Sequence, residues 1–101
     1  MSSFTNAYMV VFELPSVFTK EMFNTIPKQR KVANKLLVTG KIISYTLAAD
    51  RSTLWVIFKC ESESELIFMI DKLPMTIYFE YTYHEIMFHE VLHAEPTFSQ
   101  N

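Results

Sequence analysis

The stretch KIISYTLAADRSTLWVIFKC, residues 41–60, decides the fold that we expect for this chain. It contains two runs rich in β-branched and aromatic residues, Ile42–Ala48 and Leu54–Cys60, and such runs favour strands. The short polar sequence at residues 50–52 is typical of a turn that joins antiparallel neighbours. We therefore predict a β-hairpin in the middle of the chain.

A strand and a helix are predicted before this hairpin. The apolar, β-branched run Tyr8–Leu14 favours the strand. Thr19 is placed to cap the N-terminus of the helix and Gly40 to end it, because threonine and glycine are preferred at those positions. Pro27 removes a backbone donor inside the helix, so we expect a kink there, or a split into a short turn and a main helix.

A second helix and a last strand are predicted after the hairpin. Ser62 and Glu65 have the spacing of a capping box, and Pro74 stops the helix that they open. Alternating aromatic residues in Phe79–Phe88 favour a fourth strand. The order β-α-β-β-α-β is that of the ferredoxin-like fold. We therefore predict a single α+β domain over residues 1–101, with its core at 8–89 and an irregular tail at 90–101.

The predicted sheet has four strands, is antiparallel and has the strand order 4-1-3-2. We take its two central strands, 8–14 and 54–60, to run parallel to each other. Because side chains alternate along a strand, one face of the sheet is almost wholly apolar and should receive both helices. The second face is mixed, and no helix is left to cover it.

We expect a second copy of the chain to cover the second face, sheet against sheet, as a two-fold dimeric α+β barrel. Its polar residues would then line an interior pocket. The second face collects Met9, Val11, Glu13, Ile42, Ser44, Thr46, Trp55, Ile57, Lys59, Glu80, Thr82, His84, Ile86 and Phe88.

A candidate catalytic cluster follows from this arrangement. With the central strands taken as parallel, Glu13 and Lys59 are expected near the same end of the sheet. The last strand, running antiparallel beside the first, brings Glu80 close to Glu13. Two carboxylates and an ammonium group could tune a general base, and the alternative is a rim salt bridge of small net effect.

Other residues of the second face are candidates for the same pocket. His84 could shuttle a proton near neutral pH, or serve as a structural group. Trp55 could stack on a ligand, or pack in the dimer core. Ser44 and Thr82, together with Glu80, are expected to contact a ligand.

The string HEVLH at residues 89–93 has the spacing of a zinc-protease motif, which requires a helix. On a continued strand, His89 and His93 would stand about 13 Å apart, too far for one ion. After a helical turn, Pro96 and Ser99 stand where a longer zinc motif needs glycine and histidine. We therefore predict no metal site.

The composition excludes several classes of function. The net charge of −2 and the lack of aromatics among the basic residues of the first helix predict no nucleic-acid partner. A single glycine rules out glycine-rich nucleotide loops, and we expect no cofactor. The single cysteine, Cys60, fits a buried thiol in a cytoplasmic protein. The absence of a leader pattern or an apolar run of about 20 residues predicts no membrane contact.

Several segments together resemble the muconolactone Δ-isomerase family. They are Gly40, the hairpin at 41–60, ESESELIFMIDKLP at 61–74, MTIYFEYTYHEI at 75–86 and the Leu14-Pro15 step. The resemblance covers residues 8–88. It implies a dimeric α+β barrel, often assembled into larger rings of dimers, and cofactor-free isomerisation of a small lactone by proton transfer.

Three functions stay open. The first is a cofactor-free isomerase of a small lactone or carbonyl compound. The second is a non-catalytic homo-oligomer that binds a small apolar ligand inside the barrel, and the third is an oligomer whose pocket is packed shut. The chain departs from the family in the basic run Lys28–Lys31 and in residues 41–45, which lack Trp, Arg and His. Since one fold hosts many activities, the fold alone does not decide among the three.

Overall fold

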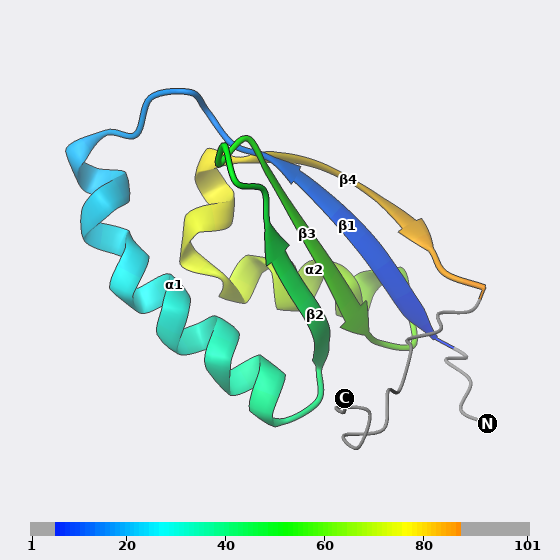
Figure 1. Cartoon of the computed structure of the whole chain (residues 1–101). Coiled ribbons are helices and arrows are strands. Elements are labelled where there is room, and N and C mark those ends of the chain that lie inside the picture. The colour runs from blue at the N-terminus through cyan, green and yellow to red at the C-terminus, as the bar shows by residue number, and fades with distance from the viewer. Residues whose placement is uncertain (1–5, 88–101) are drawn as a thin grey trace, which may run out of the picture.

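A computed structural model describes residues 6–87 of the chain. The elements follow the predicted order, with one short 3-10 helix added before the last strand (Figure 1). They are β1 (Ala7–Glu13), α1 (Lys20–Val38), β2 (Ile42–Leu47), β3 (Thr53–Lys59), α2 (Glu63–Lys72), η1 (Pro74–Tyr78) and β4 (Glu80–Glu85). The predicted α+β, ferredoxin-like arrangement is confirmed.

The four strands form one sheet in the order β2-β3-β1-β4, which is the predicted order read from the other edge. Every neighbouring pair is antiparallel. The expectation that the two central strands run parallel is therefore wrong. The crossover through α1 makes β1 and β2 parallel, and the hairpin then turns β3 back between them. As a result Ala7 pairs with Lys59, and Glu13 pairs with Thr53.

Both helices pack on one face of the sheet, and α2 passes behind the strands in Figure 1. The alternation of β1 and β3 produces the core, because Val10, Phe12, Val56 and Phe58 are completely buried on that face. The helices add Ala33 and Leu36 from α1 and Leu66, Met69 and Ile70 from α2. The prediction that the apolar face receives both helices is confirmed.

Local capping contacts determine where both helices begin. The Thr19 hydroxyl accepts a hydrogen bond from the Met22 backbone N–H (3.2 Å), and the Ser62 hydroxyl accepts one from that of Glu65 (3.1 Å). The Glu65 carboxylate reaches back one residue further than in an ideal capping box, to the N–H of Glu61 (2.8 Å). Both predicted helix starts are confirmed.

The end of α1 is also as predicted, whereas the predicted split of its interior at Pro27 does not occur. Gly40 has a φ of 80° and donates to the Leu37 carbonyl, and Lys41 donates to that of Leu36, which together make a Schellman motif. Pro27 lies inside α1 and does not split it, since the helix is continuous over 19 residues.

One residue of the predicted second face lies on the first face instead. Ile42 is 2% exposed and belongs to the core cluster. A β-bulge between Ile42 and Ser44 inserts one extra residue against β3, and a one-residue shift moves a side chain to the opposite face. The prediction holds for Ser44, which pairs with Ile57 on the face without helices.

Candidate functional site

The sheet surface without helices, called here the open face, is where the sequence places its candidate site. Its centre is apolar and its flanks are polar. Ser44, Ile57, Met9 and His84 form one row of neighbours across the strands, and Thr46, Trp55, Val11 and Thr82 form the next. Thr82 and His84 are exposed, and Trp55 is 38% exposed. Four of the predicted residues are therefore neighbours on this face: Ser44, Trp55, Thr82 and His84.

The predicted cluster of Glu13, Lys59 and Glu80 does not form. Glu13 and Glu80 are direct partners on β1 and β4, as expected. Lys59 pairs with Ala7, at the other end of β1. Six residues of extended strand separate the two ends by roughly 20 Å. The prediction failed because it rested on parallel central strands, and the antiparallel pairing sends Lys59 to the far end.

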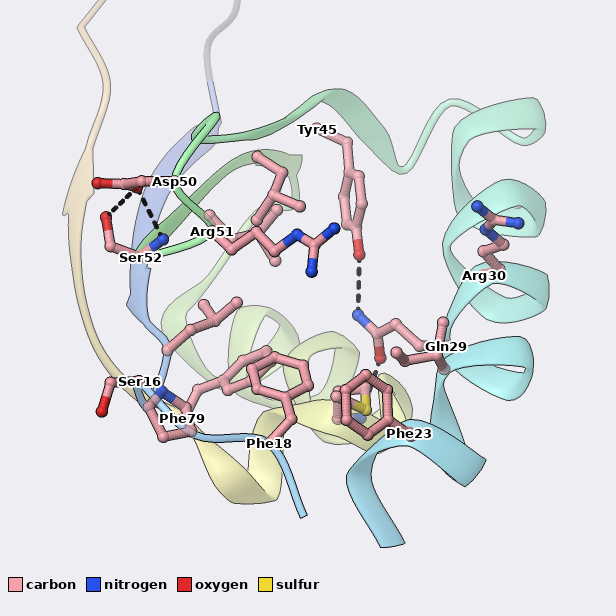
Figure 2. Close-up of a pocket in the computed structure, with 16 residues that line it drawn as sticks. Ser16, Phe18, Phe23, Gln29, Arg30, Tyr45, Asp50, Arg51, Ser52 and Phe79 are labelled. Atoms are coloured by element: carbon pink, nitrogen blue, oxygen red, sulfur yellow. Dashed lines mark hydrogen bonds between the residues drawn. The ribbon is translucent and has the colours of Figure 1, made fainter. Parts of the chain in front are cut away.

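A cavity of about 810 Å³ lies on the helix side of the sheet, away from the open face (Figure 2). It is bordered by the β1–α1 connection, the N-terminal half of α1, the β2–β3 turn and η1, and it is partly open to the surface. Most of its lining is apolar and includes Leu14, Phe18, Phe23, Ile26, Leu47 and Phe79. Sequence reasoning missed this cavity, because it assigned the whole helix side of the sheet to a closed core.

One wall of the cavity contains a buried side-chain amide, that of Gln29. Gln29 of α1 is 7% exposed, and its Nε2 donates to the Tyr45 hydroxyl on β2 (2.9 Å). Its Oε1 accepts from the backbone N–H of Met75 at the start of η1 (3.0 Å). Figure 2 shows the Tyr45 ring and the Gln29 amide pointing toward each other. Gln29 thus ties a helix, a strand and η1 together at the cavity.

Helical spacing in the sequence could have identified Gln29. It precedes Val32 by three residues and Ala33 by four, so it is a polar residue on the buried side of α1. A buried polar side chain needs hydrogen-bond partners, so such a residue marks a specific contact. The partners themselves, Tyr45 and Met75, lie 16 and 46 residues away along the chain. Helical spacing alone does not indicate them.

Burial also shapes the chemistry of Tyr45. Desolvation raises the pKa of its hydroxyl above the ordinary value of 10, while the hydrogen bond from Gln29 lowers it by a smaller amount. The hydroxyl is therefore protonated at neutral pH. It acts as a neutral hydrogen-bonding group and does not act as a base.

Two arginines and one carboxylate lie at the cavity rim. The guanidinium of Arg51 extends from the β2–β3 turn toward Tyr45 in Figure 2, and Arg30 stands along α1. Asp50 points away from the cavity. Its carboxylate accepts from the Ser52 hydroxyl (2.7 Å) and backbone N–H (3.0 Å), and these bonds lower its pKa. The charge that faces the cavity is therefore positive.

Reactive groups are scarce around this cavity. Among the described residues 6–87, no histidine lines it, and the one lining carboxylate, Asp50, accepts a hydrogen bond from the Ser52 hydroxyl. Cys60 is buried elsewhere in the core, where desolvation raises the pKa of its thiol to about 11, so it is protonated at neutral pH. Such an arrangement can bind and orient a ligand, but none of the lining residues that the structure describes directs a general base into the cavity.

No cluster of three metal-ligating side chains occurs within residues 6–87. His89 and His93 of the HEVLH string lie outside the described part of the chain, as does Phe88. Over the same residues, no helix combines the length and the apolar character that crossing a bilayer requires.

No protein-family model matches the chain, and no curated protein matches it either. The resemblance to muconolactone isomerases therefore stays a prediction.

Proposed function

We propose that this protein binds a small, largely apolar molecule in the cavity between α1 and the β2–β3 turn. The observation that carries the proposal is the cavity itself, whose volume of about 810 Å³ lies within the usual range of small-molecule sites. Its walls combine apolar side chains with a few fixed polar groups, Gln29 and Tyr45 among them. That combination is typical of ligand sites, where apolar area provides affinity and polar groups provide orientation.

Binding is better supported than catalysis at this site. A cofactor-free isomerase needs a group that takes a proton from carbon and returns it. Within residues 6–87, the groups that face the cavity are a protonated tyrosine, a neutral amide and arginine, none of which is a base at neutral pH, and the one lining carboxylate, Asp50, accepts hydrogen bonds from Ser52 and points away. We therefore favour non-catalytic binding of a small apolar ligand, the second of the three open functions, but at a site on the helix side of the sheet and not inside the expected barrel.

The proposal is tested by a substitution that places a larger side chain in the cavity. Ile26 lines the cavity from α1 and is half-buried, so Ile26→Trp should occupy ligand space with little disturbance of the core. Val38→Trp is the matched control, because Val38 lies on the same helix and is 86% exposed. Binding of decan-1-ol and of decanoate is followed through the backbone N–H signal of Met75 and the side-chain amide signal of Gln29 in ¹H–¹⁵N NMR spectra.

We expect both signals to shift on ligand addition in the wild type and in Val38→Trp, and to stay unchanged in Ile26→Trp. If neither compound shifts these signals in the wild type, the cavity is not a ligand site and the proposal is wrong.

We also propose that a second copy of the chain covers the open face. Charge along this face supports a two-fold pairing. Glu13 and Glu80 face each other across β1 and β4 at one end, where like charges are unfavourable, and Lys59 lies at the other end. A two-fold axis that lies between the two sheets and is perpendicular to the strands would place the acidic end of one subunit against the basic end of its partner. Between them, Trp55 and Val11, which are still partly exposed, would be covered, whereas Ile57 is already buried within the single chain.

An isomerase acting at the open face is the second candidate. The resemblance to muconolactone isomerases and the paired carboxylates of Glu13 and Glu80 support it. Its test is deuterium exchange at an acidic C–H of a small lactone, compared between wild type and Glu13→Gln or His84→Ala. Exchange that is equally fast in all three proteins removes both residues as catalytic groups.

We further expect a cytoplasmic location, since the one cysteine is a buried free thiol.

A further inference from the structure

We infer that the ligand of the cavity is an apolar carboxylic acid, whose carboxylate is bound by the Tyr45 hydroxyl and the Arg51 guanidinium. This inference rests on the proposed function, because it names the chemistry of the molecule that the cavity would hold. It follows from the orientations of the Gln29 amide, the Tyr45 hydroxyl and the Arg51 guanidinium.

The amide of Gln29 has only one allowed orientation. Its partner on one side is the backbone N–H of Met75, which can only donate, so the Gln29 atom that meets it must be the carbonyl oxygen (3.0 Å). The amide nitrogen is then turned toward Tyr45 (2.9 Å). An exchange of oxygen and nitrogen would set an N–H group against the Met75 N–H, at the cost of a lost hydrogen bond in a buried site.

The orientation of Gln29 in turn decides the role of Tyr45. Since the amide nitrogen donates, the Tyr45 oxygen must accept, and its own proton is left for another partner. This O–H is protonated at neutral pH, since the ordinary pKa of tyrosine is 10 and burial raises it further. Tyr45 lines the cavity, so a molecule bound there meets a neutral donor of fixed position.

Arg51 adds a positive charge on the same side. It has a φ of 65°, a left-handed conformation that is unfavourable for a residue with a side chain, and its guanidinium extends toward Tyr45 (Figure 2). The nearby carboxylate of Asp50 does not neutralise it, because that group is bound by Ser52 and points away. Arginine binds carboxylates through two parallel N–H groups.

Among the polar residues of the described lining, Tyr45 therefore offers a hydroxyl donor and Arg51 a guanidinium, beside apolar walls such as Leu47, Phe79 and Ile26. A molecule with an acceptor-only, negatively charged head and an apolar body matches this pattern. A carboxylic acid has both parts, since an ionised carboxylate is an acceptor without donors. An alcohol of the same length fills the same space without the charge.

The experiment compares decanoate with decan-1-ol, which have the same chain length. Affinities are measured by NMR titration for the wild type, Tyr45→Phe, Arg51→Gln and the control Lys31→Gln, which removes an exposed positive charge of α1 outside the cavity. We expect decanoate to bind about tenfold tighter than decan-1-ol, because a hydrogen bond to a charged group is roughly that strong. Arg51→Gln and Tyr45→Phe should each reduce this preference, and Lys31→Gln should leave it unchanged.

The outcomes separate this inference from the proposed function. Equal binding of the two compounds in the cavity, with no effect of Arg51→Gln, would overturn the carboxylate assignment and leave the binding function standing. Binding of neither compound would overturn both. If Tyr45→Phe does not fold, the result for Arg51→Gln decides the carboxylate assignment. Arg51 is exposed and is not a residue of the core, so its substitution should not prevent folding.

Discussion

Two backbone positions within residues 6–87 have a positive φ, for different reasons. Gly40, with a φ of 80°, ends α1 in a conformation that glycine adopts readily. Arg51, with a φ of 65°, holds a similar conformation despite its side chain, at a cost of roughly 1–2 kcal/mol. Strain of this kind is concentrated at ligand sites, and Arg51 lines the cavity.

The first prediction concerns this strained residue. Arg51→Gly relieves the left-handed conformation, so we expect the free energy of unfolding to rise by about 0.5–1 kcal/mol, part of the gain being offset by the greater freedom of glycine in the unfolded chain. Urea unfolding measures the change. The matched control is Arg30→Gly, which places glycine inside the exposed face of α1 and should lower the stability by about 1 kcal/mol. A loss of stability in Arg51→Gly would show that its backbone is not strained.

At the scale of the elements, the helix starts depend on short-range contacts. The Ser62 hydroxyl satisfies the N–H of Glu65 three residues on, and Thr19 does the same for Met22. Because these partners lie within one turn, the local sequence was sufficient to predict both starts. The bulge at Ile42 and the 3-10 turn η1 depend on packing against distant strands and helices, and neither was predicted.

The second prediction tests the capping of α2. Ser62→Ala leaves the Glu65 N–H without its side-chain acceptor, so we expect the free energy of unfolding to fall by about 1 kcal/mol. Thermal and urea unfolding of the purified variant measure this loss. Asn34→Ala serves as the control, since Asn34 is an exposed residue within α1, where alanine is well tolerated. Equal effects of the two substitutions would contradict a specific role for the cap.

At the scale of the whole molecule, the third prediction tests the proposed pairing of open faces. Lys59→Glu makes both ends of the face acidic, and the double variant Glu13→Lys/Glu80→Lys makes both ends basic. We expect each variant alone to associate at least about tenfold more weakly than the wild type, because like charges meet at the interface. An equimolar mixture of the two should associate again.

Sedimentation velocity at several protein concentrations measures this association, with Lys31→Glu on the exposed side of α1 as the control. A wild type that stays monomeric up to millimolar concentration would refute the pairing. A mixture that does not associate better than its components would refute the two-fold axis across the strands.

The candidate site was only partly predictable. Sequence alternation correctly assigned Ser44, Trp55, Thr82 and His84 to one sheet face, because side-chain direction along a strand follows from the backbone alone. It failed for Lys59, whose position depends on the direction in which β3 returns beside β1. It also failed for the cavity, which requires Gln29, Tyr45 and Met75 to meet across long stretches of chain.

The sequence by itself determined the order of the elements, the residues that cap the helices and the apolar character of the core face. These features depend on backbone geometry and on neighbours within a few positions of each other. Only the tertiary structure decided the antiparallel central pair, the switch of Ile42 to the core and the cavity beside Gln29. Each of these depends on how segments far apart in the chain pack, which no short stretch of sequence specifies.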